Sequence, residues 1–434
     1  MQPRGLKVVK RYLLLCLIFV AGVAHAQLNL KVTKGVDNPT KIAVVPFTWA
    51  GGRLPEDLGK IVGNDLEFSG QFEAIAADRM LSFPRSETEV HYRDWKALGS
   101  EYLLIGSITQ QADRYYASYE LFDVVQQKRV FAKLTVDGTE AQLRDMAHHI
   151  SDKVYETITG IRGIFSTKLI YVEAFTRPQK YRLMLSDIDG FRPRMLLETR
   201  FPLLSPVWSP NGQRVAYVSF EVDNKPSIYV QDIATGRRQQ MTNFRGLNGA
   251  PAWSPDGQKL AMALSKDGNP EIYVMNVLTR QLTRITNHFA IDHEPTWSAD
   301  GASIFFTSDR GGKPQIYEVN VASMQQERVT FDGDYNARPR VSPDGKSLVM
   351  LNKRPGTSYH IAAQDIKSGN LRILSETNLD ESPTIAPNGA MLMYATRSGG
   401  KGVLAAVSLD ARVKILQPPK QGDVREPAWS PFFK

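Results

Sequence analysis

One short phrase recurs along the second half of the chain at an almost constant interval. Its fullest form, PAWSPDGQKLAMALS, starts at Pro251, and a proline opens every copy. The interval between opening prolines is 45 residues once and 44 residues four times, at Pro206, Pro251, Pro295, Pro339, Pro383 and Pro427. A period in the forties with several short strand signals per unit predicts the blades of a β-propeller.

The interior of each unit supports this prediction. In the copy that follows Pro251, the segments QKLAMAL, EIYVMNV and QLTRIT each have the pattern of a strand, and the next copy repeats this order. The fourth strand of a blade is the least visible, and we expect it near the opening proline, at the inner or the outer side of the blade. The Pro-Asp-Gly or Pro-Asn-Gly step predicts a tight turn, because proline fixes φ and glycine accepts a positive φ.

The opening phrase also carries large apolar side chains. Trp208, Trp253 and Trp297 are expected to fill the space between neighbouring blades. Val341 and Ile385 replace tryptophan in two copies, so we expect those seams to be less tightly filled. A residue type that repeats around a ring usually serves packing, which argues against a catalytic role for the serine of WSPDG.

The first and the last units are each incomplete. Residues 165–205 contain the strands of a unit without its opening phrase, whereas 427–434, PAWSPFFK, is an opening phrase with nothing after it. Joined, the two pieces complete one blade and remove the exposed edges that an open array would leave. We therefore predict an all-β propeller of six blades over residues 163–434, closed by its C-terminal end onto the first blade.

The preceding region does not repeat and predicts a small α/β domain. We assign residues 27–40 to an N-terminal arm and 41–162 to the domain itself. The last predicted helix places apolar residues at spacings of three and four between 143 and 158. The region has no GxGxxG or Walker-type loop, so a nucleotide role has little support. The other expected elements are strands at 41–47, 71–76, 101–110, 115–125 and 128–136, and helices at 55–70 and 92–98.

The first 26 residues have the layout of a secretory signal peptide. A basic start precedes an apolar run and the small-residue pattern Ala24-His25-Ala26, so we expect cleavage after Ala26. The apolar run, from Tyr12 to about Val23, is too short for a comfortable membrane span. Removing the segment takes away four basic residues and no acid, which lowers the net charge from +8 to +4. We expect no membrane insertion of the mature chain.

The mature chain would then contain no cysteine, since the only one, Cys16, lies in the signal segment. Neither disulfides nor thiolate sites are therefore expected. The remaining positive charge is spread along the chain, whereas a nucleic-acid surface would cluster lysine and arginine, so we expect no nucleic acid as a partner.

The sequence carries no strong signature of catalysis or of a cofactor. No HExxH, GxSxG or cysteine-based pattern occurs. His148 and His149 are adjacent on the last predicted helix and should point to different faces, which argues against a metal pair. The segment 187–190, DIDG, resembles part of a calcium loop but lacks its third acid and its distant glutamate, so we interpret it as a turn. We predict no catalytic, cofactor or metal residues, and leave open an adventitious cation held by acids near the channel.

The loops before the opening prolines should gather on one face of the propeller, around its channel. Three residues before the proline, four successive blades carry Asn248, Asp292, Asn336 and Asp380. These side chains either line a polar site for a partner or cap the turns that enter each blade, and the sequence does not separate the two. For the neighbouring His293, Glu294 and Glu381 we favour partner binding.

The N-terminal arm is the second candidate site. Leu28, Leu30 and Val32 alternate with polar residues, which is the period of a strand. A strand at a free terminus can add to its own sheet or to the sheet of another protein. A frayed terminus is the alternative interpretation.

Over essentially the whole mature chain, the sequence resembles the TolB family of the bacterial Tol-Pal system. The segments IAVVPF, LGKIVGNDLEFSGQF and SDKVYETITGIRGIFSTKLIYV carry the resemblance together with the final PAWSPFFK. The SPDG repeats alone are shared with other propellers. The resemblance implies an α/β domain on a six-bladed propeller, a periplasmic location, and neither enzymatic activity nor a cofactor.

The resemblance also implies partners and a role in outer-membrane integrity and constriction at cell division. The lipoprotein Pal would bind the propeller mouth, and the inner-membrane protein TolA would bind the arm through Leu28, Leu30 and Val32. Leu247 stands where the family can carry a histidine, which puts the contacts of that blade in doubt. Other outer-membrane or cell-wall-associated proteins are further expected partners. The residues expected at the Pal face are Asn248, Gly249, Ala250, His293, Glu294, Asn336, Asp380 and Glu381.

Two alternatives of a different class remain open. The first is a hydrolase or lyase gated by the propeller, against which the lack of a hydrolase domain argues. The second is a carbohydrate-binding propeller that recognises peptidoglycan directly.

Overall fold

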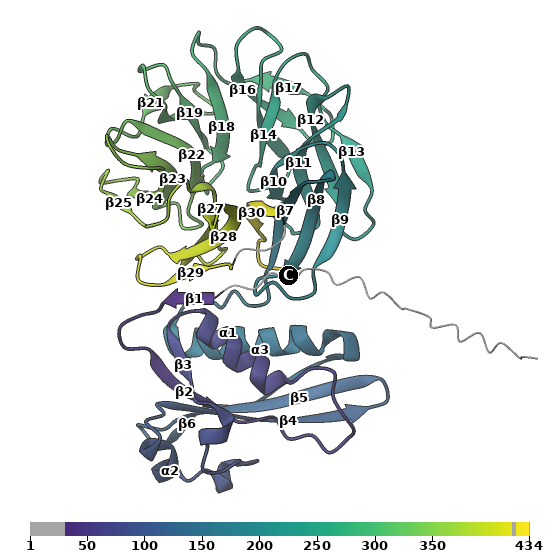
Figure 1. Cartoon of the computed structure of the whole chain (residues 1–434), viewed down its shortest axis with the longest axis vertical. Coiled ribbons are helices and arrows are strands. Elements are labelled where there is room, and N and C mark those ends of the chain that lie inside the picture. Colours follow the sequence, from purple (N-terminus) through teal and green to yellow (C-terminus); the bar gives the residue numbers. More distant parts are fainter. Residues whose placement is uncertain (1–30, 419–421, 434) are drawn as a thin grey trace, which may run out of the picture.

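The computed structural model describes residues 31–418 and 422–433. The expected signal peptide, together with Leu28 and Leu30 of the arm, lies outside these residues. The chain forms an α/β domain and a β-propeller, and two helices lie between the sheet of the first and the blades of the second (Figure 1).

The α/β domain is built on a five-stranded sheet. The order is β3-β2-β4-β5-β6, in which β2 runs parallel to both β3 and β4 while the remaining pairs are antiparallel. Helices α1 and α3 cover one face of the sheet, and Trp95 of α2 is buried on the other. The elements are β2 (Thr40–Val44), α1 (Leu58–Phe68), β3 (Phe72–Ala74), α2 (Tyr92–Ala97), β4 (Tyr102–Gln111), β5 (Arg114–Asp123), β6 (Lys128–Thr139), α3 (Leu143–Thr159) and the short 3-10 helices Ala77–Arg79, Glu87–Glu89 and Glu140–Gln142.

Local signals place the ends of the two long helices. Asp57 caps α1 by accepting a hydrogen bond from the backbone N–H of Lys60 at 3.0 Å. Gly160 ends α3 in the left-handed conformation, with φ of 74°. Both helices agree with the sequence-based prediction, as do the strands of the domain.

The propeller has six blades of four antiparallel propeller strands each, as predicted. In each blade the opening phrase forms the first strand of the sheet, and these strands line the central channel, so the strand whose place was open is the innermost one. The first three blades comprise β30 (Asp423–Trp429), β7 (Lys168–Thr176), β8 (Gln179–Asp187) and β9 (Arg194–Thr199); then β10 (Leu203–Trp208), β11 (Arg214–Val222), β12 (Lys225–Asp232) and β13 (Arg238–Gln240); then β14 (Asn248–Trp253), β15 (Lys259–Leu264), β16 (Glu271–Asn276) and β17 (Leu282–Arg284).

The other three blades repeat this arrangement. They comprise β18 (Asp292–Trp297), β19 (Ser303–Ser308), β20 (Gln315–Asn320) and β21 (Gln326–Arg328); then β22 (Tyr335–Val341), β23 (Ser347–Lys353), β24 (His360–Asp365) and β25 (Leu371–Ile373); then β26 (Glu381–Ile385), β27 (Met391–Ser398), β28 (Lys401–Ser408) and β29 (Lys414–Leu416). The phrase after each inner strand is a turn. In the third blade, Asp256 accepts hydrogen bonds from the Ser254 hydroxyl at 2.5 Å and from the Gln258 N–H at 2.9 Å.

The ring closes as the two incomplete units predict. The C-terminal strand β30 pairs antiparallel with β7, from Asp423 opposite Ala174 to Trp429 opposite Leu169. The Trp429 indole donates a hydrogen bond to the Thr167 hydroxyl at 2.8 Å. One blade is therefore assembled from both ends of the propeller sequence.

The repeated tryptophans fill the seams between blades. Trp208, Trp253 and Trp297 are each buried in a cluster that combines their own blade with the preceding one. The indoles of Trp208 and Trp297 also donate across the seam, to the backbone carbonyls of Ala428 at 3.0 Å and Ala252 at 3.1 Å. Val341 and Ile385 are half-buried at the equivalent positions, and the looser filling of their seams stays a prediction.

The described part of the arm forms one strand on the propeller. Strand β1 (Lys31–Lys34) pairs antiparallel with β29, so the sixth blade carries a fifth strand at its outer edge. All four residues of β1 are exposed, and Val32 lies opposite Ile415. A strand here could add to a sheet of its own chain or to that of another protein, and in this structure β1 adds to its own chain.

Replacing Trp429 by alanine should destabilise the propeller by about 3–5 kcal/mol, because the change empties a buried site and leaves the closing strand less firmly held. Urea unfolding, followed by a spectroscopic signal of the propeller, measures this loss in the free energy of unfolding. Phe433→Ala removes a half-exposed ring that packs edge-to-face on Trp208, and should cost only about 1 kcal/mol. Equal losses for the two variants would contradict the role given to the closing strand.

Candidate functional site

The polar residues three positions before the opening prolines are buried. Asn248 and Asn336 are each 0% exposed. The Asn248 amide accepts a hydrogen bond from the Phe244 N–H at 3.1 Å and donates to the Phe244 carbonyl at 2.7 Å. The Asn336 amide donates to Gln315 Oε1 at 2.9 Å and to the Asp332 carbonyl at 2.8 Å. Both side chains thus hold the loop that enters the blade.

The two aspartates of this set are buried as well. Asp292 forms an ion pair with Arg310 at 2.7 Å, and Asp380 accepts hydrogen bonds from the hydroxyls of Thr377, at 2.7 Å, and Ser375. Burial raises the pKa of both carboxyl groups, although hydrogen bonds oppose the rise. The turn-capping interpretation therefore describes the local role of Asn248, Asn336 and Asp380, whereas Asp292 pairs with Arg310 of its own blade. Whether the loops that they hold receive a partner stays a prediction.

A recurring backbone strain lies immediately before each opening proline. The six residues at this position have φ between 47° and 55°, in the left-handed region that non-glycine residues rarely adopt. Each such residue costs on the order of 1–3 kcal/mol, so its recurrence in every blade reflects a demand of the fold. The ladder between the inner and second strands shifts its register here in every blade. We call these residues the channel ring: Ser205, Ala250, Glu294, Arg338, Ser382 and Glu426.

The channel ring carries charge on three of its six members. The Arg338 guanidinium lies 3.0 Å from Glu294 Oε1 and 3.7 Å from Glu426 Oε1, and it donates a hydrogen bond to the Ser382 hydroxyl. Each glutamate also accepts a backbone N–H of the following blade, Glu294 from Arg338 at 3.0 Å and Glu426 from Ser205 at 3.2 Å. The two carboxylates therefore link neighbouring blades at the centre of the propeller.

These contacts decide the ionisation of the ring. Burial opposes the charge of Glu294, but the hydrogen bond with His293 and the charge of Arg338 prevail and lower its pKa to about 2. Burial likewise opposes the charge of Arg338, and the carboxylates of Glu426 and Glu294 raise its pKa nonetheless. His293 Nδ1 lies 3.3 Å from Glu294 Oε2. At neutral pH the ring thus holds fixed ion pairs.

The rim around this ring carries exposed apolar side chains among its polar ones, which the sequence did not predict. Leu247, Ile291 and Leu379 directly precede three of the buried polar residues, and they are 37%, 45% and 51% exposed. Phe289, in the loop of Ile291, is 86% exposed, and Phe331, in the loop before Asn336, is 73% exposed. The sequence signal was one large aliphatic residue directly before Asn248, Asp292 and Asp380, but the polar residues beside it indicated a polar mouth.

The remaining predicted residues of this face differ in exposure. Glu381 is exposed at the start of its inner strand, and His293 and Glu294 are half-buried. Ala250 belongs to the channel ring and is half-buried, whereas Gly249 is buried. The structure thus brings the predicted residues of four blades to one end of the channel, with His293, Glu294 and Glu381 the most accessible of the charged ones.

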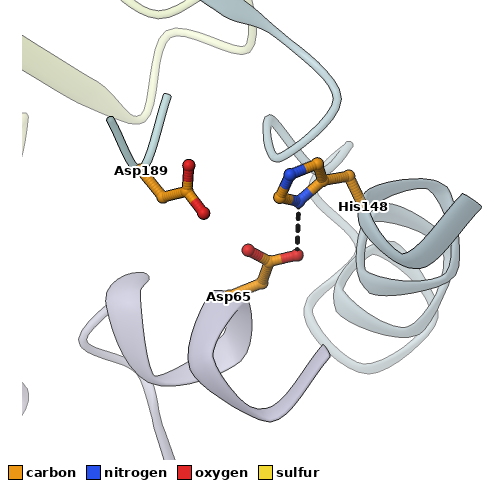
Figure 2. A group of neighbouring side chains, drawn as sticks. All are labelled: Asp65, His148 and Asp189. Atoms are coloured by element: carbon orange, nitrogen blue, oxygen red, sulfur yellow. Dashed lines mark hydrogen bonds and ion pairs between the residues drawn. The ribbon is translucent and has the colours of Figure 1, made fainter. Parts of the chain in front are cut away.

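A second group of ionisable side chains lies where α1 and α3 meet the first blade. Asp65, His148 and Asp189 place possible ligand atoms within 4.8 Å of one another (Figure 2). His148 Nδ1 lies 2.8 Å from Asp65 Oδ2, which also accepts a hydrogen bond from the Ser151 hydroxyl at 2.6 Å. As predicted, the adjacent histidines face apart, since His148 is buried and His149 is exposed.

The protein supplies its own cations to this group, so it makes a poor metal site. Arg144 forms an ion pair with Asp189, while Lys168 and Arg192 bind Asp187 at 2.6 and 2.8 Å. Burial opposes protonation of His148, but the carboxylates of Asp65 and Asp187 raise its pKa to about 10. A protonated imidazole has no lone pair for a metal. The segment 187–190 is a turn, as predicted, and its acids connect the two domains.

Comparison with known proteins places the chain in a family. A family model described as the TolB amino-terminal domain matches residues 28–130, and one described as the TolB beta propeller domain matches residues 155–433. The chain belongs to the TolB family. Residues 155–433 include all six blades and the channel ring, so the candidate mouth lies wholly within the region that the TolB propeller model matches.

Individual relatives agree with this membership. A Tol-Pal system protein TolB of Pseudomonas putida is 54% identical over 245 residues, which cover 55% of this chain and 56% of the relative. The corresponding protein of Pseudomonas fluorescens is 52% identical with the same coverage. The match thus spans about half the length of these curated TolB relatives. The crystal structure of TolB from Acinetobacter baumannii has a TM-score of 0.87 at 41% identity and covers 94% of this chain and 100% of that one.

Replacing Glu294 by glutamine should lower the free energy of unfolding by on the order of 2 kcal/mol at pH 7. The pKa of Glu294 is lower in the folded protein than its ordinary value of 4.5, so its contribution is complete above about pH 4.5 and is lost as the pH falls toward 2. The difference between wild type and variant should therefore shrink over that range. Denaturant unfolding at a series of pH values measures it.

Glu327→Gln is the matched control, because Glu327 is exposed on the outer strand β21 of the same blade. This variant should leave the unfolding free energy within about 0.5 kcal/mol of wild type. A pH-independent difference for Glu294→Gln would contradict the ion-pair assignment.

Proposed function

We propose that the chain is a non-enzymatic periplasmic adaptor of the Tol-Pal system. It binds the lipoprotein Pal at the propeller mouth and TolA through the N-terminal arm, and so supports outer-membrane integrity and constriction at cell division. Membership in the TolB family, whose curated relatives carry the name Tol-Pal system protein, supports the assignment.

The observation that carries the mouth proposal is the combination of an apolar rim and a charged centre. Exposed apolar side chains from several neighbouring loops are typical of a surface that binds another protein. The fixed charges of Glu294 and Arg338 inside that rim would then orient a partner rather than drive its association. Leu247, Ile291 and Leu379 come from three different blades, so a partner seated there would contact several blades at once.

The ionisation of the channel ring favours binding over catalysis. A general acid or base works best with a pKa near the operating pH. The contacts around Glu294 and Arg338 move their pKa values away from neutrality in opposite directions. Such groups hold a permanent charge pattern and do not exchange protons readily at neutral pH.

The arm proposal rests on the way β1 joins its sheet. A short ladder with β29 and one hydrogen bond from the Thr33 hydroxyl to the Lys414 carbonyl, at 3.0 Å, hold it, and all four of its residues are exposed. A peripheral strand of this kind can leave one sheet edge and pair with another, which is the mode of β-strand addition.

The described residues contain no helix that is both long and apolar enough to cross a membrane.

Binding of the soluble domain of Pal, measured by calorimetry, tests the mouth. The double variant Phe289→Ala/Phe331→Ala should bind at least tenfold more weakly, a loss of about 1.4 kcal/mol, because it removes the two most exposed rings of the rim. Leu278→Ala is the matched control, since Leu278 is 91% exposed in the turn after β16, at the opposite end of the blade.

The other outcomes separate the alternatives. Undiminished binding of Pal by the double variant would move the site away from the rim. Absence of Pal binding together with retention on purified, protein-free sacculi would favour the carbohydrate-binding propeller.

Removing residues 27–34 from the mature chain should abolish capture of the soluble domain of TolA while leaving Pal affinity within about twofold, because β1 lies on the outer edge of one blade. Pull-down on immobilised TolA, with Pal calorimetry as the folding control, measures both. Unchanged TolA capture would place that contact elsewhere on the chain.

A further inference from the structure

The channel has a second compartment on the side away from the mouth. A cavity of about 410 Å³ extends from the channel ring toward the turns that follow the inner strands. Prolines of four such turns contribute to its wall: Pro210, Pro343, Pro387 and Pro431. We call this space the lower cavity. Because its walls include these turns, a ligand in the lower cavity and a protein partner on the mouth loops would occupy different ends of the channel.

One residue breaks the regularity of the lower cavity. The position after each opening proline holds a short side chain in five blades, whereas the fifth blade places Arg340 there. Arg340 lines the cavity together with the hydroxyl-bearing Thr296 and Thr384 at the equivalent positions of the flanking blades. The five short residues are Val207, Ala252, Thr296, Thr384 and Ala428.

The Arg340 guanidinium lacks an ionic partner among the described residues. Within residues 31–418 and 422–433, its only hydrogen bond runs from Nη1 to the carbonyl of Pro339, at 2.8 Å. The two carboxylates of the cavity, Glu294 and Glu426, are already paired with Arg338. Burial lowers the pKa of Arg340, and the charge of Glu294 offsets this only in part. A guanidinium has five N–H donors, so most of those of Arg340 are unused.

We propose that the lower cavity binds a small, partly apolar molecule through a single carboxylate group, with Arg340 as the residue that receives it. A guanidinium and a carboxylate match in shape and form paired hydrogen bonds. The walls contributed by Trp208, Trp253 and Trp429 accept an apolar substituent. The volume admits a molecule of the size of one or two amino-acid residues, such as a peptide C-terminus or a short organic acid.

The charge inventory of the cavity selects this class of ligand. Glu294 and Glu426 balance Arg338 and Arg340, so the lining is neutral before a ligand binds. A singly charged carboxylate adds little repulsion from the two glutamates, whereas a doubly charged phosphate adds more. This proposal does not depend on which protein occupies the mouth.

The experiment titrates the mature protein with N-acetylalanine and follows the fluorescence of the tryptophans that line the cavity. N-acetylalaninamide, the neutral analogue, controls for the carboxylate, propionate distinguishes a simple organic acid from a peptide terminus, and inorganic phosphate tests the charge argument. Arg340→Thr installs the residue of both flanking blades, and Arg340→Lys keeps the charge without the paired donors. Arg237→Thr, at an exposed arginine of the second blade, is the matched control.

We expect N-acetylalanine to bind saturably, and Arg340→Thr to weaken this binding at least tenfold. N-acetylalaninamide and inorganic phosphate should not bind in this way. Arg340→Lys should show intermediate affinity, and Arg237→Thr should bind as wild type does. A stronger response to propionate would assign the site to organic acids. Three results would overturn the proposal: no binding of N-acetylalanine at concentrations of about 10 mM, equal binding of N-acetylalaninamide, or equal binding by a folded Arg340→Thr variant. Thermal unfolding checks that the variant folds.

Discussion

Everything at the centre of this molecule depends on one ladder, the pairing of β30 with β7. The same strand that completes the first blade contributes Glu426 to the channel ring and offers the Ala428 carbonyl to the Trp208 indole. Its Trp429 binds Thr167, next to Lys168, which reaches Asp187 at the domain junction. Ring closure, channel chemistry and attachment of the α/β domain are thus parts of one connected structure.

The two ends of the channel have different chemistry although the same six strands build both. At the mouth, loops present large apolar side chains around ion pairs that are fixed at neutral pH. On the turn side, prolines and tryptophans surround an arginine that pairs with no carboxylate in the described part of the chain. The difference arises because a strand in a propeller blade runs from one face to the other, so residues only two positions apart can serve separate surfaces.

The repeated features of the propeller could be predicted from the sequence. The features that depend on contacts between residues distant along the chain could not. The opening proline recurs every 44 or 45 residues, most often with a tryptophan two positions later, so blade number and closure followed from spacing alone. The left-handed residues of the channel ring were not predictable, because Glu294 and Arg338 are not types that signal a positive φ. Nor did the sequence separate capping from binding at Asn248 or Asp292, since a short polar side chain suits both roles. The junction ion pairs of Arg144 with Asp187 and Asp189 were missed because no local pattern connects residues so far apart.

Closure by the last strand also determines when the propeller can be complete. Trp429 pairs opposite Leu169, so the contact that shuts the ring joins residues 429 − 169 = 260 positions apart, whereas hairpins within a blade join near neighbours. Contacts between distant residues slow folding, because the chain must be ordered before they form. Five blades can therefore assemble while the chain emerges, and the inner edge of β7 stays unpaired until the final residues arrive. During that interval the unfinished ring presents the unpaired backbone groups of β7, which are of the kind that extended peptides can also pair with.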